Sequence, residues 1–392
     1  MKNKKQNPVR VLHIVGAMYP GGMGNYIMNL YRSIDRDNVQ FDFIIHTRKE
    51  DDYVDLVREM GAHVYELPRL TKHPIKNLRM IRRIVRDNNI SVVIRHTANA
   101  LVTPQLLAAK LGGAVTICHS HSTTDPQETL HSLGQRLMRI STDERWACSE
   151  AAGRWMYGEL EYRVINNAID VDEFSYETEK RLAVREELLG GLSGLEDAFG
   201  LENASVDVLN SRIYGHVGNL SEVKNHTYLL KVFRKILDKD PNSYLVCVGE
   251  GVLRRKIEDE IVALGMENHV ILTGIRRDVS SIMSAIDVLL FPSIYEGLPL
   301  TLIEAQAAGL PCIISDVITD DVDVTSELGL INKLNIGDDP SVWADMAVET
   351  ISNDSSKVSR DDPRIRELIR EHGYDLAALS AWFEEHMLEM AE

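Results

Sequence analysis

The chain has 392 residues, 44% of them hydrophobic and 26% charged, which is the balance of a soluble globular protein and excludes a disordered or fibrous one. Its length predicts two domains, and no apolar run approaches the roughly 18 residues that a membrane span needs. The net charge of −16 is unevenly spread, because residues 1–165 carry +6 and the remainder carries −22. An acidic half joined to a mildly basic one indicates two domains with different partners.

Strand and helix signals alternate along the first half of the chain. Arg10–Val15 predicts a strand that leads into a Gly-rich turn with Gly21 and Gly22, and VLHIVGAM is therefore a first strand and not a secretory signal. Such alternation predicts a parallel sheet covered on both faces. The other expected strands are Phe41–His46, His63–Leu67, Val92–Arg95 and Val115–His119, and the expected helices include Val54–Met60, Ile75–Asp87 and Pro104–Leu111.

The same pattern restarts after residue 205, which predicts a second Rossmann-like half. The expected domains are 1–175, a linker or excursion over 176–205, a second domain over 206–370, and a C-terminal helix over 371–392 that packs back toward the first domain. Ligands of such sheets bind at the carboxyl ends of the strands, so we expect the site in a cleft between the halves. The expected strands of the second half are Ile213–Val217, Tyr244–Val248, Val270–Thr273, Val288–Phe291 and Cys312–Ser315.

The four cysteines, Cys118, Cys148, Cys247 and Cys312, have no paired spacing. Three of them lie in apolar runs. We therefore expect reduced, buried thiols in a cytoplasmic protein.

Two glutamates, Glu296 and Glu304, flank the start of a predicted helix in SIYEGLPLTLIEAQAAGLPCIISD. Pro299 suits the first helical turn, and the free amides there form an anion site at the positive end of the helix dipole. Glu304 lies about 7 Å further along the axis, at roughly 1.5 Å per residue, where a ribose attached to a bound phosphate would sit. An ionised carboxylate accepts hydrogen bonds from two adjacent hydroxyls. Glutamates at a helix start also simply complement the dipole, and the spacing alone leaves that alternative open.

Glu296 and Glu304, with seven residues between them, resemble the E-x7-E motif of glycosyltransferase family 4. These are retaining enzymes of the GT-B fold, an α/β architecture of two Rossmann-like doubly wound domains that face a central cleft. The resemblance covers nearly the whole chain, is weakest over 178–205, and is closest in wording to the capsule and exopolysaccharide branch. It rests on Gly21–Gly22, HSHST at 119–123, CSEAAG at 148–153, INNAID at 165–170, GHVGNLSEVKNH at 215–226, GEG at 249–251 and LTGIRRDV at 272–279.

The resemblance implies a role for each matching residue. Glu304 would bind the nucleotide ribose, Glu296 would face the donor sugar, and Lys224 and the amides after Glu296 would hold the diphosphate. His119 would lie near the anomeric carbon, and no enzymic nucleophile is required. The implied catalytic residues are His119, Lys224 and Glu296, and the implied substrate-binding residues are Gly21, Gly22, Asn219, Lys224, Ile275, Arg276, Glu296, Gly297, Leu298, Leu300, Thr301 and Glu304.

Structural alternatives remain for two of these residues. Lys224 would otherwise be a solvated surface lysine, and His119 a core histidine at a strand end. His119 and His121 form a candidate metal pair, but zinc sites need three or four ligands and the sequence shows no clear further set. We therefore expect no metal and no cofactor.

Two positions depart from the family pattern. Asn219 stands where arginine is common, so half of the cationic clamp on the diphosphate is missing, and Gly24 replaces an acidic residue that often follows the Gly pair. Either change is compatible with altered donor choice, reduced activity or a non-catalytic role. Arg276 and Arg277 are the candidates to supply the missing charge.

Other nucleotide-binding classes fit less well. A nicotinamide-dependent oxidoreductase is disfavoured because the glycines after the first strand do not form G-x-G-x-x-G and no acid ends the second strand. A P-loop NTPase is disfavoured because no Walker lysine follows either Gly-rich turn. Asp321-Val322-Asp323 resembles a metal-binding D-x-D motif, but its acidic loop indicates solvated surface.

The expected function is transfer of a sugar from a nucleotide sugar, with UDP as the nucleotide, to a glycan or lipid-linked acceptor of surface polysaccharide synthesis. The alternatives are a weakly catalytic nucleotide-sugar-binding subunit and a sugar-nucleotide epimerase of the same fold.

Residues 72–86 are strongly basic and amphipathic. Lys72, Lys76, Arg79, Arg82, Arg83 and Arg86 flank an apolar stripe that contains Ile75, Leu78, Ile81 and Val85. This segment predicts peripheral contact with an anionic membrane, at the inner face of the cell membrane, without penetration. The alternative is an ordinary helix that packs on the sheet and leaves its cations in water. Nucleic acid is not among the expected partners.

Overall fold

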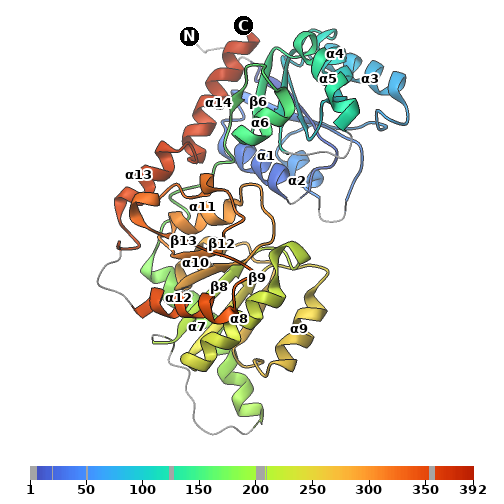
Figure 1. Ribbon diagram of the computed structural model, residues 1–392. Coiled ribbons are helices and arrows are strands. Elements are labelled where there is room, and N and C mark those ends of the chain that lie inside the picture. Colours follow the sequence, from blue (N-terminus) through green and yellow to red (C-terminus); the bar gives the residue numbers. More distant parts are fainter. Residues whose placement is uncertain are drawn as a thin grey trace. The chain divides into compact units, whose positions relative to one another are not determined.

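The computed structural model describes the chain except for residues 1–6, 20, 50–51, 123–127, 200–207, 209 and 353–357. It divides into two compact units, Met1–Ala168 with Gly373–Glu392, and Ile169–His372 (Figure 1). The division falls earlier than the expected boundary at residue 175. The C-terminal residues from Gly373 onward belong to the first unit.

The first unit is built on a parallel sheet of seven strands in the order β3-β2-β1-β4-β5-β6-β7. The order reverses beside the first strand, so β1 lies between β2 and β4. The strands are β1 Val9–Ile14, β2 Val39–Ile45, β3 Val64–Glu66, β4 Val92–Thr97, β5 Val115–Ser120, β6 Glu144–Ala147 and β7 Arg163–Val164.

Helices cover both faces of this sheet. They are α1 Gly22–Ser33, α2 Val54–Glu59, α3 Pro74–Asp87, α4 Thr103–Lys110, α5 Glu128–Ser141, α6 Glu150–Tyr157 and α14 Leu376–Ala391. One apolar core joins the sheet to α1, α2 and α14, and a second joins its other face to α3 and α4. Figure 1 shows α14 beside the sheet although it comes from the far end of the sequence.

The second unit repeats the plan with a six-stranded parallel sheet in the order β10-β9-β8-β11-β12-β13. Its strands are β8 Arg212–Val217, β9 Ser243–Val248, β10 Val270–Gly274, β11 Val288–Phe291, β12 Cys312–Ser315 and β13 Ile331–Leu334. Its helices are α7 Thr178–Phe199, α8 His226–Lys239, α9 Arg254–Ala263, α10 Val279–Ala285, α11 Leu300–Ala307, α12 Pro340–Ser352 and α13 Pro363–Glu371. The predicted class, two parallel Rossmann-like sheets, is confirmed.

Complete burial explains why apolar runs located most strands. Every residue of β2, β9 and β11 is buried, as expected when helices cover both faces of a parallel sheet. Cys118, Cys247 and Cys312 are buried in such strands, and Cys148 is partly buried. The sequence pattern missed β6 and β13 because their sequences, ERWA and INKL, are short and half polar.

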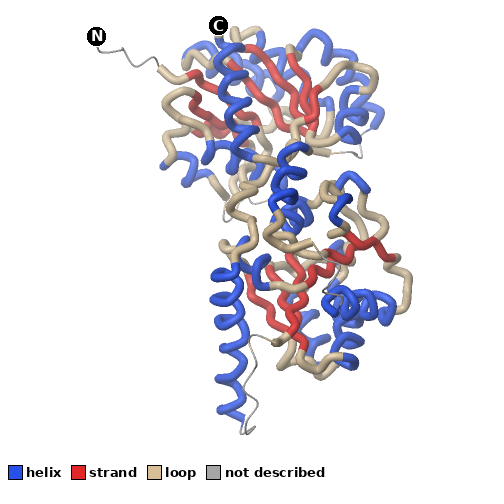
Figure 2. Tube along the Cα trace, turned by 90° about the vertical axis from the view of Figure 1, so that its left-hand side faces the viewer, coloured by secondary structure: helices blue, strands red, loops and turns tan. Residues whose placement is uncertain are grey.

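The stretch expected to be a linker or excursion contains the long helix α7, seen at the side of the second unit in Figure 2. Its inward face carries the buried Arg185 and the partly buried Arg181 beside Val184 and Leu188. Both arginines pair with Asp287, which also accepts a 2.8 Å hydrogen bond from the Ile213 amide. An ionic contact thus replaces part of the apolar stripe. Residues 200–205 of the expected linker lie outside the described part.

Within the described ranges, no helix combines the length and the apolar composition needed to cross a bilayer.

Asp287→Ala should lower the free energy of unfolding by roughly 3–5 kcal/mol, because it leaves the buried Arg185 guanidinium without its carboxylate. Urea unfolding followed by tryptophan fluorescence measures the loss. Asp238→Ala, which breaks an exposed pair with Arg234, is the matched control and should cost less than about 1 kcal/mol. Similar losses in the two variants would contradict an anchoring role for Asp287.

Candidate functional site

The reversal of strand order in the second sheet lies between β8 and β11, and the loops that follow these strands meet there. Ligands of open parallel sheets bind at such a point. The Ile294 amide donates to the Val223 carbonyl over 2.8 Å, and the Asn225 side chain donates to the Pro292 carbonyl over 3.2 Å. The two loops are therefore fastened to each other before any ligand binds.

Lys224 and Glu296 lie at the centre of this junction. The Lys224 Nζ is 2.6 Å from Glu296 Oε1, and the two side chains are only 13% and 15% exposed. The ammonium also lies 4.4 Å from the centre of the Phe291 ring. Such burial contradicts the alternative of a solvated surface lysine. An ammonium has three donors, so Lys224 can hold Glu296 and still donate to an anion.

The GEG segment packs directly on the loop after β8. A Cβ at Gly249 would lie 2.1 Å from the Gly218 carbonyl oxygen, and one at Gly251 would lie 2.4 Å from that of Leu220. Gly249 also has φ +139°, which disfavours any other residue. Glycine at both positions therefore lets the loops after β8 and β9 touch.

Helix α11 presents its amino end to the same region. Pro299 is its N-cap, with φ −75° and ψ 110°, so the helix begins one residue later than expected, at Leu300. Amides of a first helical turn have no partner within the helix, which leaves those of Leu300 and Thr301 for a ligand. Gly297 and Leu298 lie in the loop just before them.

Gln306 fixes the position of α11. Its Nε2 donates to the carbonyls of Leu302 and Val322, and its Oε1 accepts from the amide and the hydroxyl of Thr325. A buried amide with both ends satisfied stabilises one arrangement of this helix.

Glu304 lies one turn into α11 and is half-buried. No ion pair or side-chain hydrogen bond involves its carboxylate among the described residues. Burial, with a smaller contribution from the nearby Glu173 carboxylate, raises the pKa of Glu304 to about 7. The site thus holds a half-buried carboxylate that has no hydrogen-bond donor among the described residues.

Asn219 and Ile275 lie on exposed loops of the same edge. Asn219 Oδ1 accepts a hydrogen bond of 3.2 Å from the Ser221 hydroxyl. Ile275 is 79% exposed and follows β10. Both side chains are accessible to a ligand.

Arg276 cannot supply the charge missing at position 219. Its guanidinium is bound by Asp278 and by Glu187 of α7, and these hydrogen bonds raise the pKa of Arg276. Two carboxylates neutralise its charge, so the suggestion that it replaces the family arginine is disfavoured. Arg277, which is exposed, is the remaining neighbouring candidate.

The Gly-rich loop of the first unit precedes α1, with Gly21 as its N-cap and Gly22 as its first residue. Gly22 faces open space, whereas a Cβ at Gly24 would lie 2.0 Å from the Tyr19 carbonyl oxygen. This loop conformation therefore has no room at position 24 for the acidic residue of the family pattern. Pro20, in the same turn, lies outside the described part.

His119 lies near the end of β5, fully buried, and neither of its ring nitrogens has a hydrogen-bond partner among the described residues. It pairs in register with His96 on β4, and His121 follows two residues later. Burial holds the pKa of His119 and of His96 well below the usual value and lowers that of His121 to about 3.

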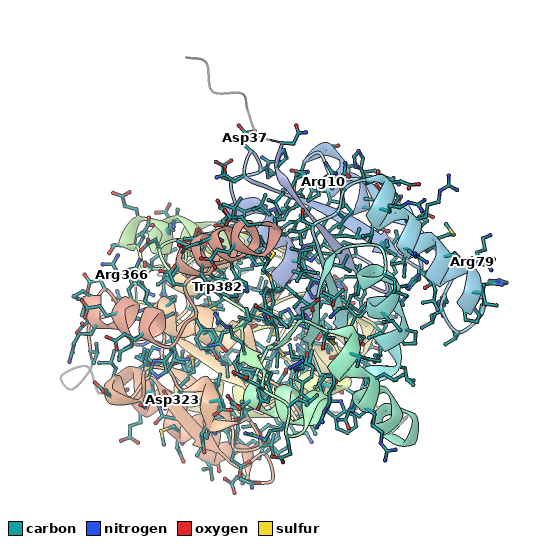
Figure 3. The ribbon with its side chains drawn as sticks, turned by 90° about the horizontal axis from the view of Figure 1, so that it is seen from above. Arg10, Asp37, Arg79, Asp323, Arg366 and Trp382 are labelled. Atoms are coloured by element: carbon teal, nitrogen blue, oxygen red, sulfur yellow. The ribbon has the colours of Figure 1, made fainter. Side chains whose placement is uncertain are left out.

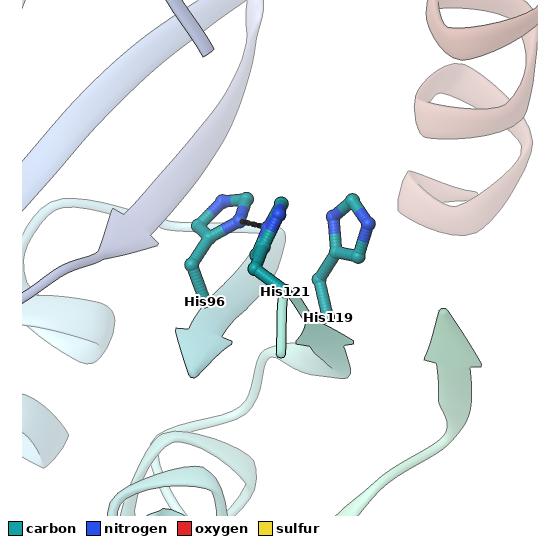
Figure 4. Close-up of side chains that lie close together, drawn as sticks. All are labelled: His96, His119 and His121. Carbon is teal, nitrogen blue, oxygen red and sulfur yellow. Dashed lines mark hydrogen bonds between the residues drawn. The ribbon is translucent and has the colours of Figure 1, made fainter. Parts of the chain in front are cut away.

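These three histidines gather at one point (Figure 4). Their ring nitrogens lie within 4.8 Å of one another, and His96 Nδ1 is 2.9 Å from His121 Nε2. The structure thus brings to His119 and His121 a third histidine, His96, which the sequence did not single out. The sequence did contain a signal for this cluster, a histidine near the carboxyl end of several strands, in VLHIV, VIRHT and TICHSHS. Parallel strands bring these ends together at one edge of the sheet.

The D-x-D segment is less exposed than expected. Asp321 is on the surface, but Asp323, labelled in Figure 3, is half-buried, and its Oδ1 has no partner among the described residues. Burial raises the pKa of Asp323. Val322, which lies between the two aspartates, is fully buried.

Comparison with known proteins gives two family matches and several relatives. Residues 20–173 match the model described as Glycosyltransferase Family 4, and residues 202–322 match Glycosyl transferases group 1. The chain is 32% identical over 379 residues to the putative glycosyltransferase EpsF of Bacillus subtilis, covering 93% of each. It is 24% identical to an Escherichia coli UDP-Gal:alpha-D-GlcNAc-diphosphoundecaprenol alpha-1,3-galactosyltransferase, covering 76% of this chain and 78% of the relative.

Solved structures agree in fold. Alr3699/HepE of Anabaena, in complex with UDP, matches with a TM-score of 0.73 at 16% identity, covering 96% of this chain and 99% of that one. A glycosyltransferase from Rickettsia africae matches with a TM-score of 0.74 at 17% identity, covering 98% and 99%. The chain belongs to the group 1/family 4 glycosyltransferases, retaining enzymes of the GT-B fold.

Proposed function

We propose that the protein transfers a hexose from a UDP-sugar to a glycan or lipid-linked saccharide during synthesis of a surface polysaccharide. The observation that carries the proposal is the buried Lys224–Glu296 pair beside the first turn of α11, with the unpaired Glu304 beyond it. Support for the choice of UDP and of the acceptor class comes from relatives, because the E. coli enzyme is named for UDP-Gal and a diphosphoundecaprenol acceptor. The Anabaena structure, in turn, contains UDP.

The proposed chemistry stabilises the charge that develops on the departing diphosphate. Lys224 and the amides of Leu300 and Thr301 would donate to its oxygens, with Gly297 and Leu298 allowing close approach. Departing phosphate oxygen would take the proton of the acceptor hydroxyl on the same face of the sugar, so retention needs no enzymic nucleophile. The protein's contribution is mainly orientation and fixed donors.

The remaining site residues have separate proposed roles. Glu304 would accept both ribose hydroxyls, and Ile275 would pack on the base. Glu296 would contact the donor sugar, and His119 is the proposed catalytic histidine near the anomeric carbon. Asn219 would contribute a neutral contact to the phosphates, which predicts weaker donor binding than an arginine would give. Transfer assays over a panel of nucleotide sugars, preselected by thermal shift, test the proposal.

We also propose that α3 contacts an anionic membrane at its cytoplasmic face. Ile81 and Val85 are buried against the sheet, so much of the apolar stripe is used in packing. Ile75 is nevertheless 65% exposed, and the basic residues around it face solvent, with Arg79 pointing outward in Figure 3. This arrangement supports electrostatic contact without penetration, at about 1 kcal/mol or less per cation.

Glu304→Gln should change stability in a pH-dependent way. The folded wild type keeps a proton on Glu304 up to about pH 7, whereas an unfolded glutamate releases it near 4.5. The folded state therefore binds more protons between these values, and wild-type stability falls as pH rises through them. The variant should melt above the wild type at about pH 8 and together with it near pH 4.5. Glu267→Gln, at an exposed glutamate, should show no such pH-dependent difference from the wild type.

Glu304 should also make donor binding pH-dependent. Only the ionised carboxylate accepts both hydroxyls, so affinity for a UDP-sugar should be full above about pH 7 and fall below it. Glu304→Gln should bind roughly 1–3 kcal/mol more weakly at high pH and lose most of the pH dependence. Isothermal titration calorimetry measures both effects. Equal affinity of variant and wild type would rule out the ribose role.

Asn219→Arg should restore the clamp and strengthen binding of UDP by about 0.2–1 kcal/mol, the range for an exposed charge pair, with a steeper dependence on salt. The matched control is Asn268→Arg, which adds the same charge just before β10, at the amino edge of the sheet. If both variants bind UDP equally well, the effect is general charge and the clamp assignment is wrong.

Changing Arg79, Arg82, Arg83 and Arg86 together to Gln should abolish co-sedimentation with vesicles of anionic lipid. Changing Lys231, Lys235, Arg255 and Lys256, four exposed cations of α8 and α9, to Gln is the control and should leave it intact. Wild-type binding should also disappear at high salt, because the attraction is screened. Vesicle binding that persists in the fourfold Arg→Gln variant of α3, or in the wild type at high salt, would contradict membrane contact through α3.

A further inference from the structure

The histidine cluster, His96, His119 and His121, belongs to the first unit and has the composition of a metal site. His96 and His119 are partners in the register of neighbouring parallel strands, so their side chains leave the sheet on the same face. The His121 amide donates to the Thr97 carbonyl, which holds His121 at the end of the same two strands. The backbones of β4, of β5 and of the segment after β5 therefore fix the three rings side by side (Figure 4).

His119 supplies a second, independent observation. Its side chain is completely buried, and both ring nitrogens lack a hydrogen-bond partner among the described residues. A neutral imidazole has one donor and one acceptor nitrogen, and leaving a buried polar group unsatisfied costs about 1–3 kcal/mol. One ring nitrogen of His119 lies within 4.8 Å of a ring nitrogen of each of the other two histidines, an environment that a cation would satisfy.

His13 extends the cluster in the way that metal-binding histidines are usually supported. His96 offers Nδ1 to the cluster, and its Nε2 lies 2.9 Å from His13 Nδ1. If Nδ1 of His96 binds a metal, the proton stays on Nε2 and donates to His13, which fixes both tautomer and ring orientation. His13 thus occupies the position of an outer-shell partner.

The ligand set selects the kind of ion. Imidazoles without oxygen ligands suit zinc and its neighbours and do not suit magnesium or calcium. Zinc–nitrogen bonds of 2.0–2.1 Å require nitrogens about 3.3 Å apart, so separations of up to 4.8 Å need only small side-chain rotations. His121 is partly exposed, which provides an entry route, and three protein ligands leave one coordination position open.

We propose that His96, His119 and His121 bind one Zn²⁺ per chain. Resting on the proposed function, in which His119 acts at the donor sugar, bound zinc also blocks sugar transfer, so the site is inhibitory. Zinc and the donor sugar then compete for the His119 side chain. The metal takes no part in the reaction.

Binding is tested on the full chain without a histidine tag, stripped with a chelator and titrated with Zn²⁺, using Co²⁺ as a spectroscopic probe of coordination. The wild type should retain one zinc per chain after gel filtration and show the visible spectrum of tetrahedral Co²⁺. His121→Ala, at the most exposed ligand, and His96→Ala should lose both. His13→Asn should weaken Zn²⁺ binding by roughly 10- to 100-fold, the range for an outer-shell partner.

Two controls separate this site from other zinc binders. His46→Ala removes a partly buried histidine that follows the neighbouring strand β2, and Cys148→Ser removes the most accessible thiol. Both variants should keep the zinc. Circular dichroism checks that each variant is folded. Absence of stoichiometric binding in the wild type, or equal binding in folded His96→Ala and His121→Ala, overturns the site.

Activity distinguishes this proposal from the proposed function. If zinc binds as described but no nucleotide sugar is transferred in its absence, the transferase proposal fails and the metal site stands. If transfer occurs and zinc at stoichiometric amounts leaves it unchanged, the inhibitory role is overturned. Inhibition that chelator reverses in the wild type supports it.

Discussion

The chemistry of this protein depends on one constraint, the reversal of strand order beside the first strand of each parallel sheet. At that point the connections leave toward opposite faces, and the carboxyl edge is left open between them. Residues remote in sequence then become neighbours. Lys224 and Glu296 are 72 residues apart and form an ion pair, and His13 and His96 are 83 apart and share a hydrogen bond. The same constraint therefore assembles a polar centre in each unit.

Much of the fold was predictable because most strands are buried on both faces and therefore appear as apolar runs. The pattern failed where burial is achieved by polar groups. In α7 the inward face carries Arg181 and Arg185, whose partner Asp287 is about a hundred residues away, and hydrophobic periodicity cannot detect an ionic contact. The short strands β6 and β13 failed for the related reason that half of their residues are polar.

The candidate site was predictable only as a set of separate residues. Family resemblance selected Lys224, Glu296 and Glu304, but it could not reveal that the first two neutralise each other while the third is half-buried with no hydrogen-bond donor among the described residues. It also suggested Arg276 as a spare cation, whereas the structure surrounds that guanidinium with two carboxylates. His96 was missed because its importance depends on the register between β4 and β5, which a single sequence does not contain. Pairing, burial and register are properties of the fold.

The close contact between Gly24 and Tyr19 limits how this protein can evolve. Any side chain at position 24 would collide with a carbonyl oxygen 2.0 Å away, so a single substitution there is disfavoured before its chemistry matters. An acidic residue at this position would first require the backbone at Tyr19 to move. The order of mutations is thereby constrained, because the backbone at Tyr19 must change before any side chain can stand at position 24.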